Sequence, residues 1–238
     1  MAPIDPELLL RAYSIGVFPM SDSRDAREVF WIEPRRRAIL PLDRFRLSRS
    51  LRKTLRAGVF EVTRDRAFGE VLRRCTEREE TWINAEIEES YNLLHRLGHA
   101  HSIECWRGGR LAGGLYGVRL GAAFFGESMF SAERDASKVA LAWLVARLKV
   151  GGFKLLDCQF MTPHLASLGA VEIGQRRYVE LLSEALGSPA GGAPGEGAAR
   201  PPAGEFGALD RLLAADPART VDSPASGWVI SQLLGHRS

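Results

Sequence analysis

The sequence predicts an α+β fold in which a small mixed N-terminal domain is followed by a mixed sheet covered by helices. In the second half of the chain, short strands joined by tight turns precede a long apolar helix and another buried strand. Antiparallel hairpins followed by such a strand–helix–strand unit indicate a mixed sheet. Residues 1–75, by contrast, show only short elements in irregular order. With 45% hydrophobic and 26% charged residues among 238, the composition is typical of a soluble globular protein.

The N-terminal region opens with a helix. Asp5 can cap this helix, Pro6 suits its first turn, and Gly16 ends it. A second, basic helix is expected further on, with Ser48 or Ser50 as its cap. The elements expected after the first helix are strands at 30–32, 38–42 and 60–63 and helices at 48–56 and 65–76.

The second region has a more regular order. Asn84 is expected to cap a helix that Gly98 stops, and Asp135 to cap a long helix over 136–150. Tight turns are expected where paired glycines or a Leu-Gly pair separate apolar runs. The other expected elements are strands at 101–106, 111–119, 122–130, 153–160 and 171–173 and helices at 164–168 and 178–186. This order is compatible with an N-acetyltransferase-like (GNAT-like) fold.

The composition changes sharply after the last of these helices. Gly, Pro and Ala fill 16 of the 21 positions from 187 to 207. Such a segment buries too little apolar surface to offset the entropy lost on ordering, so it is expected to be a disordered linker. The chain is therefore expected to divide into a small domain with a basic helix (1–75), a GNAT-like domain (76–186), the linker (187–207) and a C-terminal tail (208–238).

Charge is distributed unevenly along the chain. The net charge is only +3, but from Arg24 to Arg56 there are eleven Arg or Lys against four Asp or Glu. This asymmetry favours a polyanionic partner such as nucleic acid, although a solvated basic helix face explains such a run equally well. Three scattered cysteines and the lack of a secretory signal or long apolar run lead us to expect a cytoplasmic protein.

Polar residues interrupt two apolar strands in positions that suggest a site. Glu127 stands inside an expected strand, where a carboxylate must be paired if it is buried; a sheet-edge residue facing water is the equal alternative. Asp157 and Gln159 share one face at the carboxyl end of another strand, a common place for binding sites. Cys158 points the other way and is better explained as a core residue than as a nucleophile.

Several uncommon strings follow one another in an order that resembles the bacterial leucyl/phenylalanyl-tRNA–protein transferase family, through residues 4–182. The strings are Ala12-Tyr, Gly16-Val-Phe-Pro, Ser48-Arg-Ser-Leu-Arg-Lys-Thr-Leu-Arg, Thr81-Trp-Ile, Ala100-His-Ser-Ile-Glu-Cys-Trp, Gly113-Gly-Leu-Tyr-Gly-Val, Phe125-Gly-Glu-Ser-Met-Phe-Ser, Ala136-Ser-Lys, Asp157-Cys-Gln and His164-Leu-Ala-Ser-Leu-Gly-Ala. The resemblance implies a small N-terminal domain and an acetyltransferase-like C-terminal domain. It also implies an enzyme that moves Leu or Phe, and in some members Met, from aminoacyl-tRNA to a protein with N-terminal Arg or Lys. The product is a degradation signal of the N-end rule pathway.

The resemblance also implies roles for individual residues. Asp157 would hold the incoming amine, Gln159 would relay or stabilise charge, and Glu127 would hold the α-amino group of the aminoacyl ester. The apolar side chains of an aminoacyl pocket would be Phe124, Met129, Leu141, Leu144, Leu148 and Leu156. Trp82 and Tyr91 would lie near the terminal adenosine, and Arg49, Arg52, Lys53 and Arg56 would form one helix face toward tRNA phosphates. No metal, cofactor, membrane or DNA is implied.

One departure and two rival functions remain. Met20 stands where many members have Trp, so apolar contact with the adenosine is kept and ring stacking, worth about 1–3 kcal/mol per base, is lost. An acyl-CoA-dependent N-acetyltransferase would require a Gly-rich turn before the long helix, where this chain has Asp135-Ala-Ser-Lys. A non-catalytic RNA-binding protein would use the basic run and leave Glu127, Asp157 and Gln159 without a role.

Overall fold

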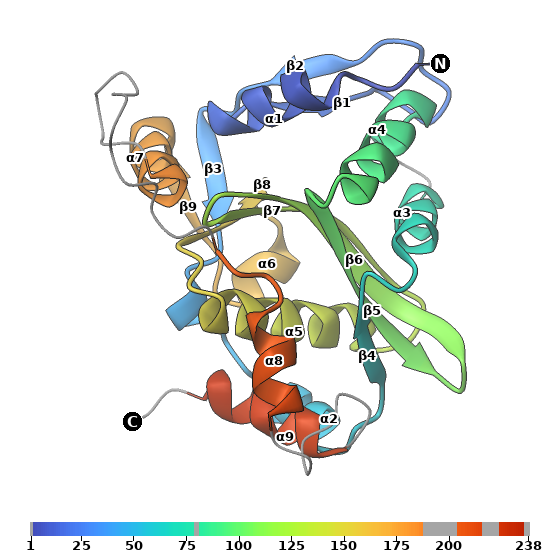
Figure 1. The fold of residues 1–238 in the computed structure, drawn as a ribbon, viewed down its shortest axis with the longest axis vertical. Coiled ribbons are helices and arrows are strands. Elements are labelled where there is room, and N and C mark those ends of the chain that lie inside the picture. Colours follow the sequence, from blue (N-terminus) through green and yellow to red (C-terminus); the bar gives the residue numbers. More distant parts are fainter. Residues whose placement is uncertain (1, 79–80, 188–203, 216–223, 236–238) are drawn as a thin grey trace.

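The computed structural model describes residues 2–78, 81–187, 204–215 and 224–235 (Figure 1). Its centre is a seven-stranded sheet in the order β4-β5-β6-β7-β8-β3-β9, and β1 and β2 form a separate pair. The strands are β1 (Phe18–Met20), β2 (Phe30–Ile32), β3 (Arg36–Ile39), β4 (Glu61–Arg64), β5 (Ala100–Arg107), β6 (Arg110–Leu120), β7 (Ala123–Ser131), β8 (Leu155–Gln159) and β9 (Val171–Gly174). The helices are α1 (Pro6–Ser14), the 3-10 helix η1 (Leu42–Arg44), α2 (Arg49–Arg56), α3 (Phe68–Thr76), α4 (Ala85–Arg96), α5 (Ala136–Val150), α6 (Pro163–Ser167), α7 (Gln175–Leu186), α8 (Ala208–Ala214) and α9 (Pro224–Leu233).

The large sheet is mixed, which confirms the predicted α+β class. β7 and β8 run parallel because α5 carries the chain across between them, whereas the other neighbouring strands are antiparallel. β3 lies between β8 and β9, and β4 lies at the far edge beside β5. Strands from both sides of residue 75 thus share one sheet, so the expected domain boundary does not coincide with an edge of the sheet.

Helices cover both faces of the sheet (Figure 1). α5 packs on one face against β5, β6 and β7, and α2, α8 and α9 pack against α5 from outside. This placement explains why α5 is apolar on nearly all sides, with buried residues from Ala136 to Leu148. α1, α3, α4 and α7 cover the other face, where their side chains form a second core cluster. Among the described residues, no helix has the length and apolar character needed to cross a bilayer.

Side-chain caps were predicted for α1, α2, α4 and α5, and three of these four are present. The Asp5 carboxylate accepts from two backbone N–H groups of α1, and Ser48 and Asn84 accept from the third residues of α2 and α4. The prediction for Asp135 is wrong: this residue has a left-handed φ of 66°, and its carboxylate pairs with Lys138 Nζ at 3.0 Å instead of capping α5.

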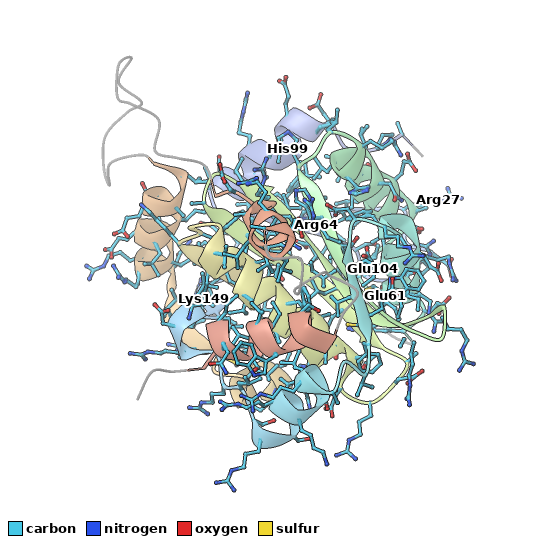
Figure 2. All side chains as sticks on the ribbon, turned by 60° about the horizontal axis from the view of Figure 1, so that its bottom comes forward. Arg27, Glu61, Arg64, His99, Glu104 and Lys149 are labelled. Atoms are coloured by element: carbon cyan, nitrogen blue, oxygen red, sulfur yellow. The ribbon has the colours of Figure 1, made fainter. Side chains whose placement is uncertain are left out.

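The C-terminal part returns to the α5 side of the fold and packs there. Phe206 is 3% exposed, with its ring stacked against Phe124 at a centroid distance of 5.4 Å. Asp210 on α8 accepts from the Arg147 guanidinium at 2.5 and 2.8 Å and lies 3.1 Å from Arg64 Nε; Figure 2 shows Arg64 beside this helix. Of the expected disordered linker, residues 188–203 lie outside the described residues. The expectation is wrong for 204–207, because Phe206 is part of the core.

Candidate active site

A pocket of about 740 Å³ opens where β7 and β8 separate. The two strands pair only over residues 123–125 and 155–157. Glu127 and Gln159 lie just beyond this paired stretch and both line the pocket. Because the carboxyl ends of parallel strands commonly carry binding sites, the separation gives a cavity bordered by polar groups from both strands.

Glu127 is the extra residue of a β-bulge. Ser128 pairs with Tyr116 and Gly126 with Gly117, so Glu127 has no partner on β6 and its side chain leaves the regular alternation of the strand. The glycine at 117 is required there, because a Cβ would lie 2.2 Å from the Phe125 carbonyl oxygen. The bulge aims a carboxylate toward the gap between β7 and β8.

Neutral donors surround the Glu127 carboxylate. Oε1 accepts from the Tyr13 hydroxyl at 2.7 Å and from Gln159 Nε2 at 3.1 Å, and Oε2 accepts from the Tyr91 hydroxyl at 3.1 Å. Burial raises the pKa of Glu127 to about 7, the nearby Asp157 carboxylate adds to this rise, and the two tyrosine hydroxyls and Arg37 oppose it. The group therefore changes its ionisation near neutral pH.

Asp157 is fully buried, does not line the pocket, and is held by Arg37. Arg37 Nε lies 3.0 Å from each carboxylate oxygen, and Nη2 lies 2.6 Å from Oδ2. The Tyr178 hydroxyl also donates to Oδ2 at 2.8 Å, and the Gln159 backbone N–H donates to Oδ1 at 2.9 Å. Asp157 thus receives donors on both oxygens before any substrate binds.

Gln159 links the two carboxylates. Its backbone N–H bonds Asp157 while its side-chain amide bonds Glu127, so the three residues named from the sequence do lie together. Its φ of 55° is uncommon for a residue with a side chain. Asp157 and its partners therefore fix the backbone that aims the amide into the pocket.

Of the six residues expected around the aminoacyl group, four line the pocket and two do not. Met129, Leu141, Leu144 and Leu156 line the pocket, with Leu115, Phe160 and Leu165 beside them. Phe124 and Leu148 do not. Phe124 faces the C-terminal Phe206, and Leu148 is a fully buried residue of the core on the α5 side of the sheet.

The residues expected near an adenosine are divided in the same way. Trp82 and Met20 line the pocket. Tyr91 is fully buried, and its hydroxyl contacts Tyr13 at 2.6 Å as well as Glu127. A base cannot stack on this buried ring, so the expectation that Tyr91 lies near the adenosine is wrong. Its hydroxyl instead holds the Glu127 carboxylate.

Sequence reasoning missed Tyr13, Arg37 and Tyr178. Arg37 stood in the basic run that was expected to face a polyanion, but it is 1% exposed, and it also donates to the Gly16 carbonyl at 2.9 Å. Its place directly before the apolar strand expected at 38–42 was the one available signal of burial.

The four basic residues expected to meet tRNA phosphates do lie together. Leu47 and Ala57 complete a shallow depression of about 610 Å³ on α2, whose basic lining residues are Arg49, Arg52, Lys53 and Arg56. α9 packs alongside, where Arg56 Nε donates to the Ser231 hydroxyl at 3.1 Å. Within the described part of the chain, no group of three His, Cys, Asp or Glu side chains is placed to hold a metal ion.

An apolar cavity with a carboxylate and an amide at its head suits an apolar side chain whose polar reacting atoms stay near the strand ends. Such an arrangement suits acyl transfer, in which the protein positions the reacting groups and stabilises the developing charge.

Comparison with known proteins identifies the family. A model described as leucyl/phenylalanyl-tRNA protein transferase matches residues 39–183, and a model of its N-terminal domain matches residues 2–35. The chain belongs to the leucyl/phenylalanyl-tRNA protein transferase family.

Two relatives support this assignment, whereas one solved structure is only remotely similar. Leucyl/phenylalanyl-tRNA–protein transferase of Rhizorhabdus wittichii is 62% identical over all of both chains. That of Novosphingobium aromaticivorans is 54% identical over 99% of this chain and 97% of its own. A solved C-terminal domain of a lysylphosphatidylglycerol synthetase from Agrobacterium fabrum is 15% identical, with a TM-score of 0.36 over 76% of this chain and 63% of its own. That likeness is too low to assign a fold.

Proposed function

We propose that this protein transfers Leu or Phe, with Met as a third acyl group, from aminoacyl-tRNA to the N-terminal Arg or Lys of acceptor proteins. The modified proteins would be marked for degradation by the N-end rule pathway in the cytoplasm. The observation that carries the proposal is the apolar pocket headed by Glu127 and Gln159, in a chain that belongs to this family.

The reaction is an aminolysis of the aminoacyl ester. The acceptor's neutral α-amine attacks the ester carbonyl carbon, a C–N bond forms, the C–O bond to the ribose breaks, and the amine's proton ends on the ribose oxygen. We assign Glu127 to the ammonium group of the bound aminoacyl ester, because a buried carboxylate is a strong acceptor for a cationic amine. Gln159 Nε2 has a second N–H besides the one given to Glu127, and this N–H is assigned to the developing oxyanion.

Asp157 takes a different role from the one expected for it. Its oxygens already accept from Arg37, Tyr178 and the Gln159 backbone. We therefore assign it the role of a positioning residue that fixes Gln159. The acetyltransferase-like fold belongs to the same proposal: antiparallel β5–β7, the crossing helix α5 and parallel β8 support it. The division into residues 1–75 and 76–186 is part of the same proposal, with strands of both parts in one sheet.

The deciding experiment follows labelled Leu from leucyl-tRNA to a peptide that begins with Arg, beside the same peptide beginning with Ala. We expect label on the Arg peptide alone. Binding of tRNA without transfer to either peptide would contradict the proposal and favour an RNA-binding protein.

The shape of the pocket allows a prediction about selectivity. Leu144→Val should enlarge the pocket and raise the use of Phe relative to Leu by up to about tenfold, since one methylene discriminates over roughly this range. Leu148→Val, one helical turn away and outside the lining, is the matched control and should leave the ratio unchanged. Competition between phenylalanyl-tRNA and leucyl-tRNA in one reaction measures the ratio independently of the amount of folded enzyme.

A further inference from the structure

Two arginines stand at the edge of the pocket and have no part in the mechanism above. Arg74 belongs to the last turn of α3, and Arg78 follows shortly after this helix; both line the pocket. Arg74 holds its guanidinium 5.4 Å from the centre of the Phe130 ring, and Arg78 donates to the Met129 carbonyl oxygen. Both contacts are to uncharged groups of β7.

The carboxylates of the pocket do not neutralise this pair. Among the described residues, Glu77 is the acid that lines the pocket beside these arginines and accepts from Arg74 at 2.7 Å, but it also pairs with Arg73, whose side chain is 54% exposed and does not line the pocket. Glu127 is bonded to Tyr13, Tyr91 and Gln159. Among the described residues of this edge, two guanidinium groups are thus accompanied by one carboxylate, which is shared with an arginine outside the pocket, so these residues carry a net positive charge.

The position of the arginines relative to Glu127 indicates what they meet. Met129 and Phe130 lie two and three residues beyond Glu127 on β7, and a strand advances by about 3.3 Å per residue. A ribose carries its 3′ and 5′ oxygens on opposite sides. With the ester at Glu127 and the base near Trp82, the phosphate on the 5′ side of the ribose lies away from Glu127 by the length of one nucleoside. This places it toward Met129 and Phe130, the residues that Arg78 and Arg74 contact.

We propose that Arg74 and Arg78 form a subsite for a single phosphodiester, the one on the 5′ side of the terminal nucleoside of the aminoacyl donor. The subsite rests on the proposed function and is separate from the basic depression on α2. The planar fork of a guanidinium matches two phosphate oxygens, which a lysine cannot reproduce. Glu77 would repel the phosphate, and its pairing with Arg73 weakens that repulsion.

The test uses three donors of increasing size with one Arg-initiated peptide. Leucyl-adenosine has no phosphate, the leucyl ester of a cytidylyl-adenosine dinucleotide has one phosphodiester, and leucyl-tRNA has the whole backbone. Arg78→Gln should raise the KM for the dinucleotide and tRNA donors by about tenfold, with kcat unchanged and with leucyl-adenosine unaffected. Arg74→Gln should act in the same direction, and Arg78→Lys should restore part of the loss.

Two control variants separate this subsite from its neighbours. Arg96→Gln removes the same charge from an exposed position on the neighbouring helix α4, outside the pocket, and should leave the KM of all three donors unchanged. Arg52→Gln on α2 should raise the KM of leucyl-tRNA and leave the KM values of the two smaller donors unchanged. For the dinucleotide, the slope of log KM against log salt should fall by about 0.7 in Arg78→Gln, the value for one phosphate contact on a single strand.

Each outcome bears on a different claim. An equal effect of Arg78→Gln on leucyl-adenosine would mean that the residue only supports the pocket, and it would overturn the subsite. Equal KM values for leucyl-adenosine and the dinucleotide in the unmodified protein would overturn it too. If the unmodified protein transfers Leu from none of the donors, the proposed function itself fails, and the subsite with it.

Discussion

Replacement of Glu127 by glutamine is expected to lower transfer at least about 100-fold and, at pH 8, to make the protein more stable. The amide keeps the shape of the side chain and can still accept from Tyr13 and contact Tyr91. It cannot provide the negative charge that we assign to the ammonium group of the substrate, and removing one such preorganised contact commonly costs this much in rate. It also removes the burial of an ionised carboxylate, which opposes folding.

The pH dependence of the stability gain fixes its origin. The pKa of Glu127 rises from an ordinary 4.5 to about 7 on folding, so between these values the native protein holds a proton that the unfolded chain has lost. The free energy of unfolding contributed by Glu127 therefore decreases as the pH rises through this window. Glu127→Gln should unfold at a temperature several degrees higher than the unmodified protein at pH 8, corresponding to about 3 kcal/mol, with no difference at pH 4.

Thermal unfolding at both pH values checks this expectation. Glu61→Gln is the matched control, because Glu61 is exposed and pairs with Arg66 on the surface, and its effect should stay within about 0.5 kcal/mol. A destabilised Glu127→Gln protein at pH 8, or a gain that persists at pH 4, would contradict the account. Binding of an unreactive amide analogue of the aminoacyl ester gives a second readout. Its affinity should fall by up to about tenfold per pH unit below 7 in the unmodified protein, because Glu127 loses its charge there, and should stay flat in the variant.

Local pattern predicted most elements of the fold but only part of the site. Strand and helix periodicity are properties of neighbouring residues, and the long α5 and the hairpins of β5–β7 follow from them. Alternation along β7 could not predict the orientation of Glu127, because a bulge breaks the register at that residue. It could not show either that Phe124 faces the C-terminal Phe206, since that contact depends on a segment expected to be disordered.

The remaining site residues escaped prediction for a related reason. Arg37 reaches Asp157 across 120 positions, and Tyr13 reaches Glu127 across 114. Such partners are adjacent only after β3 has entered the sheet between β8 and β9 and α1 has packed on its face. A basic run in sequence therefore divides in space: Arg37 becomes a buried partner of Asp157, while Arg49 and its neighbours stay on the surface of α2.

The pair of Arg37 and Asp157 gives the other large expected effect. Arg37→Met leaves a carboxylate in a fully buried place, and Asp157→Leu leaves a guanidinium there. Each single change should lower the free energy of unfolding by about 3–5 kcal/mol, because an uncompensated buried charge remains. The double variant Arg37→Met/Asp157→Leu removes both charges and should be more stable than either single variant. Denaturant unfolding of the four proteins measures the coupling.

Arg36 and Glu172 provide the internal control for this cycle. Arg36 precedes Arg37 on β3, but its ion pair is solvent-exposed, with side-chain exposures of 66% and 37%. The same cycle at Arg36 and Glu172 should give a coupling energy of at most about 1 kcal/mol. Additive effects at Arg37 and Asp157 would show that the buried pair is not coupled as its geometry implies.

The activity of the milder Asp157→Asn separates positioning from direct contact with substrate. Asp157 does not line the pocket and acts on it through Gln159, whose backbone N–H it accepts at 2.9 Å. We therefore expect kcat to fall by about 100-fold, because a misplaced Gln159 amide no longer stabilises the transition state. The KM for leucyl-adenosine should stay within about twofold. A rise in that KM with kcat preserved would place Asp157 against the substrate, and the positioning role would have to be abandoned.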